Sequence, residues 1–435
     1  MTATQDGPVP GTGSGPAISL SELLGRPLTA RDGESLGRLS DVIIRLRGND
    51  CPLVTGLVGK VGKRQVFIPL DQVSSLGDQE LKLTSARLDL RRFERREGEV
   101  LLRADLLGHR LIDVERARLV RAANLQLARR DGELVLAGVA TRRPRPLLRL
   151  FGRGQDTGEV FRDQGEFEAL IGHSASAVLR GPFARIRRLK PAQIADLLED
   201  ASKEEQTEIL GHVHVDPELE ADVFEELDED KATQLFGARS DAEVAEVLSR
   251  MRADDAADAI AELPQRRRQP VLDLLPAGQR TKVLTLMGFN PTSAGGLMNV
   301  DFLALPGGTT AEDVIGAVRS AVSIQPEALT SVHAVDDGGR LEGVARLAAV
   351  LQADPAAELV SFCDTDPVRV GPNTDAVDVA VLMTDYNLIT IPVVDDRCVM
   401  LGVITVDDVL EVALPEDWRR REAAEPPDSH GGDAP

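Results

Sequence analysis

The chain has 435 residues, enough for about three domains, and its 42% hydrophobic and 28% charged content is that of an ordinary globular protein. Aromatic residues make up only 3%, so the cores must be built from aliphatic side chains. The formal net charge of −21 argues against general nucleic-acid binding and favours cations or a basic partner surface.

The N-terminal residues 1–16 are rich in Gly, Pro and Ser and lack the apolar segment of a signal peptide, so we expect a disordered tail. No window approaches 18 uninterrupted apolar residues, so we expect no membrane span. The three cysteines lie far apart without CxxC spacing, which predicts neither a disulfide framework nor a zinc site. These features predict a cytoplasmic protein.

Residues 17–150 carry the signals of a β-rich domain. Short β-branched runs at 40–46, 53–59 and 64–70 are separated by Gly-containing turns. The sequence LLGRPL recurs as LLGHRL 83 residues later, and a strand pattern follows each copy at the same distance. This arrangement resembles the PRC-barrel family, which implies one or two small β-barrels; chance recurrence of Leu and Gly is the alternative.

A basic segment rich in Gly and Pro follows, and we expect residues 151–180 to be a linker. Its neighbouring run RRPRPLLRLFGR could touch anionic lipid at the inner face of the membrane or a partner, although such runs are more often solvated connectors.

From residue 181 the pattern becomes helical. Each predicted helix opens on a capping residue, has acids in its first turn and repeats apolar residues at i, i+3/i+4 and i+7. Between 191 and 262 there are 22 Asp and Glu against 5 Lys and Arg, a local net charge of −17. A series of short helices predicts an α-helical superhelix. The helices are expected at 190–200, 203–213, 216–228, 228–238, 240–251 and 252–264.

Residues 301–414 change to strand–helix alternation. The segment 331–351 aligns without gaps on 390–410, and a helix precedes each copy. A duplicated αββα unit of this kind resembles a CBS pair. The last residues, 418–435, are expected to form a second disordered tail.

Two motifs make the resemblance more specific: SAGGLM between the helical and alternating parts, and VITVDDVLEV near the end. With them, the chain resembles the cytosolic part of MgtE-type magnesium channels without their transmembrane domain. The resemblance implies an acidic helical domain at 181–290, a CBS pair at 291–417, bound Mg²⁺ and a homodimer formed through the CBS pair. The expected fold class is therefore multidomain α+β: N-terminal small β-barrels, an α-helical superhelix and a C-terminal CBS pair.

The segment RMRADDAADAIAELP raises a question about charge. Its Asp254, Asp258 and Glu262 are spaced at i, i+4 on one helix, and unpaired like charges at that spacing are destabilising. A carboxylate ridge becomes useful when Mg²⁺ binds to it. The resemblance implies a ligand set of Asp254, Asp258, Asp375, Asp408 and Glu411.

The ligand set is incomplete, because Val377 and Asn387 stand where the channels carry acids, which would weaken or alter magnesium sensing. The alternative, that these acids form only solvated helix faces and caps, stays open.

The second CBS copy also contains the pattern G-h-x-[ST]-x-x-D, formed by Gly402, Thr405 and Asp408. In CBS clefts the corresponding Thr hydroxyl and Asp carboxylate would meet the phosphate and ribose of ATP or AMP. The first copy lacks the pattern, so only one nucleotide site is expected. The same short pattern also occurs as plain helix capping.

No Ser/His/Asp or Cys/His constellation and no phosphate-binding loop is present, so we expect no enzyme. The leading hypothesis is a magnesium-sensing regulator that acts on a partner, such as a membrane transporter, in divalent-cation homeostasis. One alternative is an adenine-nucleotide-responsive CBS regulator or protein-interaction scaffold. Another is an RNA-processing accessory acting through the β modules, which the negative charge disfavours.

Overall fold

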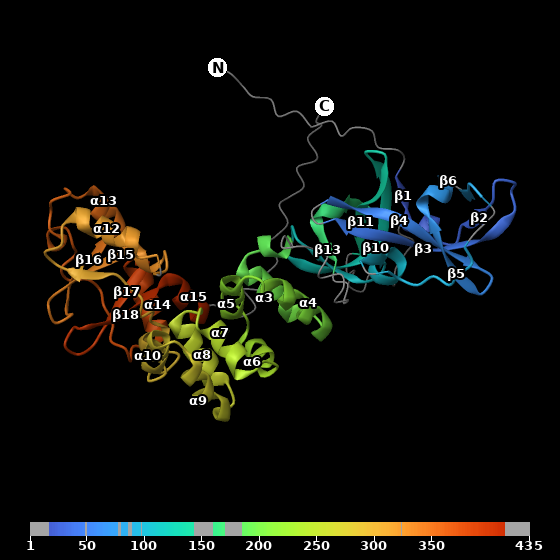
Figure 1. The fold of residues 1–435 in the computed structure, drawn as a ribbon. Coiled ribbons are helices and arrows are strands. Elements are labelled where there is room, and N and C mark those ends of the chain that lie inside the picture. Colours follow the sequence, from blue (N-terminus) through green and yellow to red (C-terminus); the bar gives the residue numbers. More distant parts are fainter. Residues whose placement is uncertain are drawn as a thin grey trace, which may run out of the picture. The chain divides into compact units, whose positions relative to one another are not determined.

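The computed structural model describes residues 17–47, 50–76, 80–85, 89–96, 98–142, 160–169, 185–322 and 324–413. The two predicted tails and most of the predicted linker lie outside these ranges. The chain forms two compact units, residues 1–228 and 229–435 (Figure 1). None of the helices in the described ranges combines the length and the apolar character that a bilayer crossing requires.

The first unit is built on one mixed sheet, whose path runs β13-β9-β10-β11-β4-β3-β2-β7-β6. Aliphatic side chains such as Leu28, Ile44, Ile68 and Leu125 fill its core. The three strands predicted from the sequence fall in β3, β4 and β5, which confirms a β-rich domain. The bounds are β1 (Ile18–Ser19), β2 (Pro27–Thr29), β3 (Ser35–Arg47), β4 (Asp50–Val61), β5 (Arg64–Pro69), β6 (Val73–Leu76), β7 (Leu81–Leu83), β8 (Glu99–Leu101), β9 (Arg110–Asp113), β10 (Arg118–Arg130) and β11 (Glu133–Arg142), with short helical turns α1 (Leu20–Leu23) and η2 (Leu102–Leu106).

The repeated Leu-Leu-Gly motif has the same backbone geometry in both places. Gly25 and Gly108, 83 residues apart, have φ of +82° and +81°, which glycine adopts without the penalty of a side chain. The Gly25 N–H donates to the Leu39 carbonyl at 2.9 Å, and the Gly108 N–H donates to the Ala122 carbonyl at 2.8 Å. Each turn is therefore joined to the long strand that follows it in the same way.

The two halves of this sheet also exchange contacts. Asp41 in β3 accepts the backbone N–H groups of Arg103 and Ala104 at 2.8 and 3.1 Å. Asn124, the equivalent residue of β10, accepts the Ser21 N–H at 3.2 Å. Likewise β1 pairs with β10, and β8 pairs with β3. This reciprocal exchange is what a duplicated module gives when its copies interlock, and it agrees with the repeat in the sequence.

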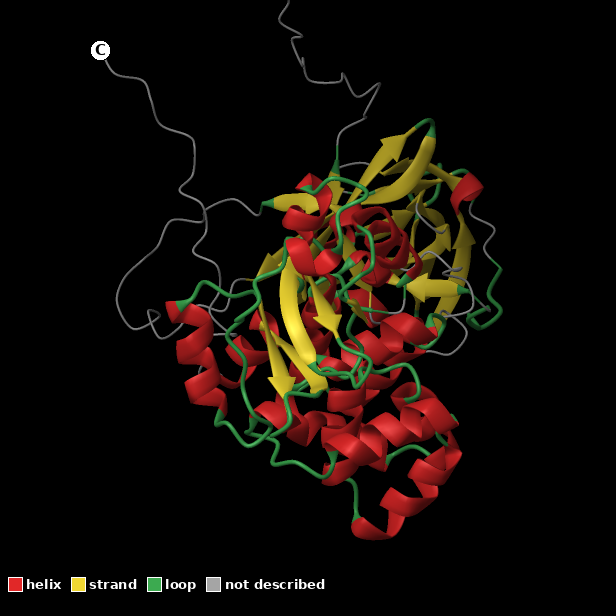
Figure 2. Ribbon diagram, turned by 90° about the vertical axis from the view of Figure 1, so that its left-hand side faces the viewer, coloured by secondary structure: helices red, strands yellow, loops and turns green. Residues whose placement is uncertain are grey.

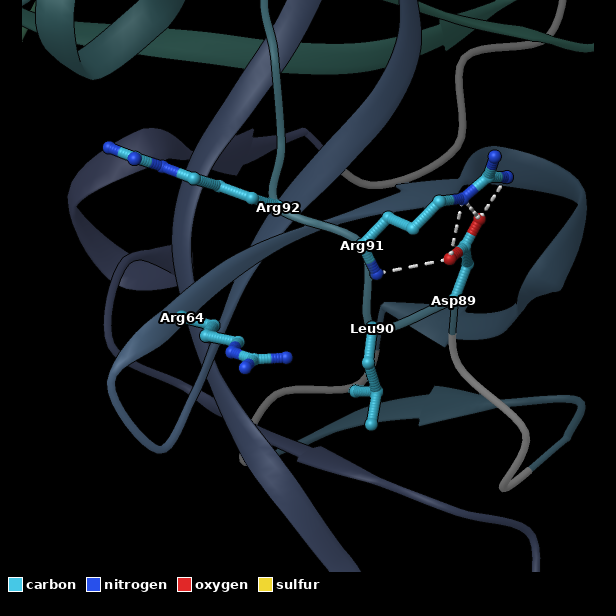
Figure 3. A pocket seen from close by; sticks show the side chains of 5 residues that line it. All are labelled: Arg64, Asp89, Leu90, Arg91 and Arg92. Carbon is cyan, nitrogen blue, oxygen red and sulfur yellow. Dashed lines mark hydrogen bonds and ion pairs between the residues drawn. The ribbon is translucent and has the colours of Figure 1, made fainter.

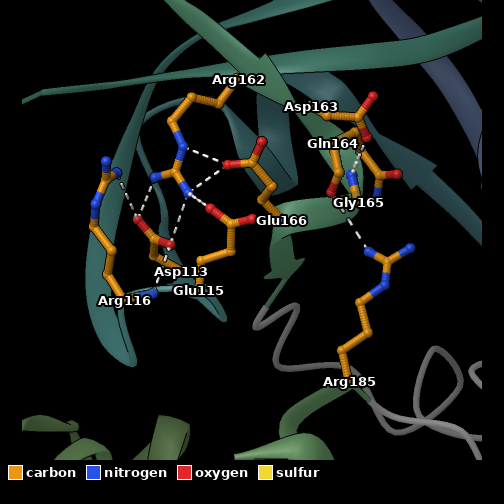
Figure 4. A network of polar contacts seen from close by, with 9 residues as sticks. All are labelled: Asp113, Glu115, Arg116, Arg162, Asp163, Gln164, Gly165, Glu166 and Arg185. Carbon is orange, nitrogen blue, oxygen red and sulfur yellow. Dashed lines mark hydrogen bonds and ion pairs between the residues drawn. The ribbon is translucent and has the colours of Figure 1, made fainter. Parts of the chain in front are cut away.

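The predicted linker contains two further strands. β12 (Phe161–Asp163) pairs with β11, and β13 (Phe167–Ala169) pairs with β9. Arg162 fixes this segment, because its guanidinium group pairs with the carboxylates of Asp113, Glu115 and Glu166 (Figure 4). The Asp113 side chain is only 1% exposed, so its charge is compensated inside the fold. Residues 160–169 therefore belong to the sheet. The sequence did not predict these strands, because the segment between the flanking Gly and Pro residues is too short for an alternating apolar pattern to be recognised.

The six helices predicted from 190 to 264 are all present, with bounds within about three residues. Ser202 and Ser240 open α4 and α7 with reciprocal capping boxes, and Asp216 caps α5. The first unit holds α3 (Pro191–Asp200), α4 (Lys203–Val213) and α5 (Pro217–Glu225); the second begins with α6 (Glu229–Gly237), α7 (Asp241–Leu248), α8 (Ala253–Glu262), α9 (Gln265–Leu274) and α10 (Ala277–Leu286).

The gapless alignment of 331–351 on 390–410 is confirmed. Each copy is an antiparallel strand pair with a bulge at the same step, followed by a helix. The copies meet at equivalent positions, since the Thr390 hydroxyl donates to Ser331 Oγ at 2.8 Å. Helices accompany the two small sheets (Figure 2). The bounds are α11 (Ala294–Leu297), β14 (Ala304–Pro306), α12 (Ala311–Ser320), β15 (Ser331–Val335), β16 (Leu341–Arg346), α13 (Leu347–Gln352), α14 (Ala376–Asp385), β17 (Thr390–Val394), β18 (Met400–Thr405) and α15 (Val406–Ala413).

Arg162→Ala should destabilise the first unit by roughly 3 kcal/mol, because it removes the main charge partner of the buried Asp113 carboxylate and leaves only the more exposed Arg116, whose guanidinium group lies 3.5 Å away. Arg130→Ala is the matched control: Arg130 pairs with Asp163, but both side chains are about half exposed, at 45% and 49%. The Arg130→Ala substitution should lower the free energy of unfolding by less than about 1 kcal/mol. Calorimetric unfolding of both variants measures the difference; equal losses would contradict a structural role for the Arg162 network.

A buried histidine in the first CBS copy predicts acid sensitivity. His333 is fully buried, its Nδ1 lies 3.2 Å from the Leu303 carbonyl oxygen, and its Nε2 has no hydrogen-bond partner. Burial lowers the pKa of His333 from 6.5 to about 4. The folded state therefore binds fewer protons than the unfolded state, so this contribution to stability is complete above about pH 6.5 and is lost as the pH falls to about 4.

His333→Leu should flatten this dependence, whose slope is at most about 1.4 kcal/mol per pH unit. Calorimetric unfolding at a series of pH values between about 4.5 and 7.5 tests it, with the exposed His109→Leu as the control. A His333→Leu variant that loses stability with acid as steeply as the wild type would refute the assignment.

Candidate functional site

The SAGGLM motif joins the helical part of the second unit to the second CBS copy. The Ala294 and Gly295 N–H groups donate to the carbonyls of Thr374 and Pro372 at 2.7 and 2.8 Å. A side chain at Gly295 would meet the Phe289 ring at 2.6 Å and the Pro372 oxygen at 2.9 Å, so this close approach needs glycine. Asn299 then pairs with Val403 of β18 through two backbone hydrogen bonds. These bonds hold residues 294–299, the docking segment, against the second CBS copy.

Asp254, in the first turn of α8, has a carboxyl group that is buried within the second unit. It is 7% exposed, and its Oδ1 atom has no hydrogen-bond partner. Burial raises the pKa of Asp254 to about 7; the Arg252 guanidinium opposes the rise, and the nearby Asp408 carboxylate adds to it. A buried carboxyl with a bare oxygen is costly unless a proton or a cation compensates it.

Asp408, in the first turn of α15, lies at the same contact and is also 7% exposed. Its Oδ2 atom accepts the Thr405 hydroxyl at 2.6 Å and the Thr405 N–H at 3.2 Å. Its Oδ1 atom accepts Arg252 Nη1 at 3.2 Å. Burial also raises the pKa of Asp408. The structure therefore brings two of the five predicted ligands, Asp254 and Asp408, to one place.

The other predicted ligands have separate surroundings. Asp258 is exposed on α8, and Asp375 is exposed at the start of α14, where its Oδ1 accepts the Val377 N–H at 2.9 Å. Glu411 lies in α15, about one turn after Asp408, and its side chain is outside the described part of the structure. Within the described ranges, no group of three or more His, Cys, Asp or Glu side chains is placed to hold a metal ion. The four predicted ligands whose side chains are described thus do not form one preassembled cage.

The carboxylate ridge of α8 is divided among three environments. Residues four apart on an α-helix are displaced by about 40° around the helix axis. A row of three such residues therefore does not face the same neighbouring element along its whole length. Asp254 is buried, Asp258 is exposed, and Glu262 lies beside Glu229 of α6, whose pKa it raises. Of the three, Asp254 is the one whose pKa the Asp408 carboxylate of α15 raises.

Sequence reasoning missed Arg252. Its Nε donates to Asp255 Oδ2 at 2.5 Å, in addition to the contact with Asp408. The i,i+3 spacing of Arg252 and Asp255 is a signal for their local pair. The contact with Asp408 is 156 residues distant in sequence, and no local pattern predicts it.

The donor set suits Mg²⁺. This ion prefers oxygen ligands, keeps several waters and is usually held by one or two carboxylates. Asp254 has a carboxylate oxygen without a hydrogen-bond partner, and the negative charge of Asp408 is close enough to raise the pKa of Asp254. A divalent cation shared by the two would compensate the charge that burial otherwise opposes.

The predicted nucleotide residues serve internal packing. A side chain at Gly402 would meet Met298 Cγ at 2.8 Å, so this glycine permits the close approach of the docking segment. Thr405, the residue before α15, is fully buried, and both its hydroxyl and its N–H donate to Asp408 Oδ2. A side chain that accepts the N–H of the residue three positions before it is one half of a capping box. The pattern therefore has a structural explanation in this arrangement.

A shallow pocket in the first unit is lined by Arg64, Asp89, Leu90, Arg91 and Arg92. Arg91 pairs with Asp89 through Nε at 2.8 Å, and the Arg92 side chain extends away from that pair (Figure 3). The guanidinium groups do not converge on one point, so the pocket is not a built anion site.

Comparison with known proteins places three domain types in the chain. The family model of the MgtE intracellular N domain matches residues 189–292, the CBS domain model matches 357–415, and the PRC-barrel domain model matches 16–90. The described helices and strands occupy the same ranges. These families are regulatory or transport-related rather than enzymatic.

Magnesium transporters are also similar to this chain in sequence. The magnesium transporter MgtE of Thermus thermophilus is 35% identical over 183 residues, which are 40% of this chain and 40% of that protein. The magnesium transporter MgtE of Bacillus subtilis is 22% identical over 231 residues, 53% of this chain and 51% of that protein. The chain thus spans about half, or less, of the length of these relatives.

A solved structure matches just over half of the chain. The cytosolic domain of the Mg²⁺ channel MgtE, crystallised in complex with ATP, is 28% identical, with a TM-score of 0.50. It aligns with 55% of this chain and 94% of that domain. The chain therefore joins a PRC-barrel domain to an MgtE intracellular N domain and a CBS pair, and it resembles the cytosolic part of MgtE-type magnesium channels.

Proposed function

We propose that this chain is a non-catalytic regulator that binds Mg²⁺ between α8 and α15 and passes the binding state to a partner involved in divalent-cation transport. The observation that carries the proposal is the buried Asp254 carboxyl group, whose Oδ1 has no partner and whose neighbour is the Asp408 carboxyl group. Both acids are members of the ligand set implied by the resemblance to MgtE channels.

The effect of the ion follows from charge. Without a metal ion, the buried carboxyl groups of Asp254 and Asp408 repel each other when both are ionised, which opposes the contact between the first turns of α8 and α15. Mg²⁺ bound there, with its remaining positions filled by water, would reverse the sign of that interaction.

An adenine nucleotide is the second candidate ligand, because the solved cytosolic domain of MgtE was crystallised with ATP. In this chain, however, Thr405 is fully buried and its hydroxyl already donates to Asp408. A nucleotide would have to break that cap and the contact of Asp408 with Arg252. The geometry therefore favours Mg²⁺ over ATP or AMP as the signal.

The partner would be a membrane transporter or channel, since the curated relatives are named magnesium transporters. The regulator would act in the cytoplasm, where free Mg²⁺ is sensed. The PRC-barrel domain would supply a separate surface for the same or another partner.

Mg²⁺ should protect α8 and α15 from amide hydrogen exchange, and Asp254→Asn should abolish that protection. Binding to the folded form alone stabilises by about 1.4 kcal/mol per site when Mg²⁺ is at about ten times its Kd. The measurement is hydrogen exchange of the full chain with and without MgCl₂, at ionic strength matched with NaCl, and again with ATP or AMP in place of Mg²⁺.

Asp230→Asn is the matched control, because Asp230 is an exposed acid on α6 of the same unit and its loss changes the net charge equally. It should leave the Mg²⁺ response intact. Equal protection by NaCl and MgCl₂ would show only screening, and protection by ATP or AMP but not by Mg²⁺ would favour the nucleotide function.

We further propose that the CBS pair forms a homodimer through α14 and α15. Exposed apolar side chains repeat at i,i+4 on both helices: Val377 and Val381 on α14 are 63% and 52% exposed, and Val406 and Leu410 on α15 are 36% and 47% exposed. The two helices pack side by side, and in this proposal their exposed apolar residues form one face. A second copy of the chain is the occupant, as the resemblance to MgtE implies.

Val381→Asp should weaken dimerisation by about tenfold or more, because it places a charge within an apolar contact. Val215→Asp, at a position 63% exposed in the first unit, is the control and should dimerise like the wild type. Analytical ultracentrifugation over a range of concentrations measures both. A wild-type chain that stays monomeric at micromolar concentration would end this proposal.

A further inference from the structure

The guanidinium group of Arg252 lies among three carboxyl groups at the α8–α15 contact. It pairs with Asp255 at 2.5 Å and with Asp408 at 3.2 Å, and its charge also acts on Asp254. The Arg252 side chain is 21% exposed, and those of Asp255 and Asp408 are 22% and 7% exposed. A fixed positive charge is therefore already present where the proposed function places Mg²⁺.

Helix capping does not explain an arginine at this position. Arg252 is the N-cap residue of α8, and its side chain makes no capping hydrogen bond. N-caps favour Ser, Thr, Asp and Asn, whose side chains accept backbone N–H groups, and a positive charge is unfavourable beside the positive end of a helix dipole. The side chain instead makes two ion pairs: a local one with Asp255 of α8 and one with Asp408, which joins α8 to α15.

Arg252 and a divalent cation would compete for the same charge. Asp408 Oδ2 is taken by Thr405, and Asp408 Oδ1 is the atom that receives Arg252. An ion shared by Asp254 and Asp408 would have to share that oxygen with the guanidinium group or displace it. Two cations a few ångströms apart also repel each other strongly in a partly buried site.

We propose that Arg252 is a built-in cation that holds α8 against α15 in the absence of metal and lowers the affinity of the Asp254–Asp408 site for Mg²⁺. The first half of the proposal stands on the ion pairs alone. The second half rests on the proposed function and deepens it, because it makes Arg252 the residue that sets the concentration at which Mg²⁺ is sensed.

Charge and geometry can be separated with two substitutions. Arg252→Gln removes the charge, so the metal-free contact should loosen and Mg²⁺ should bind about tenfold more tightly, within the usual range of coupling between sites. Arg252→Lys keeps the charge but cannot pair with two carboxylates in the manner of the planar guanidinium group. It should loosen the metal-free contact while leaving the Mg²⁺ affinity close to that of the wild type.

The experiment uses the full chain, with Arg266→Gln as the control. Arg266 is exposed on α9 of the same unit, so its substitution gives the same change of net charge away from the contact. Hydrogen exchange of residues 253–262 and 406–413 without metal measures the tether. Calorimetric titration with MgCl₂ measures the affinity, and unchanged exchange of β15 and β17 shows that each variant is folded.

The outcomes distinguish this proposal from the proposed function. If Arg252→Gln loosens the metal-free contact but neither it nor the wild type binds Mg²⁺, the magnesium function fails and the tether stands. If Mg²⁺ binds both equally, or binds the variant more weakly, the effect of Arg252 on affinity is refuted. If metal-free exchange is the same in Arg252→Gln, Arg266→Gln and the wild type, the tether is refuted.

Discussion

The constraint on which the second unit depends is the burial of two carboxyl groups, Asp254 and Asp408, at one helix–helix contact. Each is only 7% exposed, and burial raises the pKa of both. A contact of this kind is stable only if protons, an internal cation or a bound metal ion compensate the charge. The structure supplies one such cation in Arg252, which pairs with Asp408 but leaves Asp254 Oδ1 without a partner. The fold thereby makes the contact sensitive to its ionic surroundings.

The rest of the unit positions this contact. The duplicated CBS copies fix β18 and α15, because their strand pairs meet at equivalent residues such as Ser331 and Thr390. The glycines of SAGGLM then let the docking segment approach the second copy closely enough for Asn299 to pair with Val403. α9 and α10 connect α8 to this segment, and the ion pair of Arg252 with Asp408 joins the start of α8 to the first turn of α15. A change at Gly295 or Gly402 would thus disturb the carboxylate contact without touching either acid.

Much of the fold could be predicted from sequence, because its signals are local. Capping boxes at Ser202 and Ser240 gave helix starts to within a residue, and the offset of 59 between the CBS copies matched strands, bulges and helices. The offset of 83 in the β-rich domain corresponds to equivalent turns at Gly25 and Gly108. The strands at 161–169 were not predicted from the sequence, because each has only three residues and the segment is held by the non-local ion pair of Arg162 with Asp113.

Less of the candidate site than of the fold could be predicted from the sequence. The resemblance supplied five acids, but helical spacing alone could not tell that Asp254 is buried and Asp258 exposed. Nor could it reveal Arg252, whose decisive partner is 156 residues away. The pattern Gly402, Thr405 and Asp408 was open to both a nucleotide and a capping interpretation, and the hydrogen bonds of Thr405 agree with capping. Charge compensation at a long-range contact is a property of the tertiary structure, so it becomes visible only once the helices are placed.

The most direct measurement of the central claim is anomalous diffraction from crystals of the full chain grown or soaked with Mn²⁺, which accepts the same oxygen ligands as Mg²⁺. The account predicts an anomalous peak bound by Asp254 and Asp408, and no such peak in the Asp254→Asn variant. Mn²⁺ found only at other acids, with Asp254 and Asp408 unliganded at saturating metal, would contradict it.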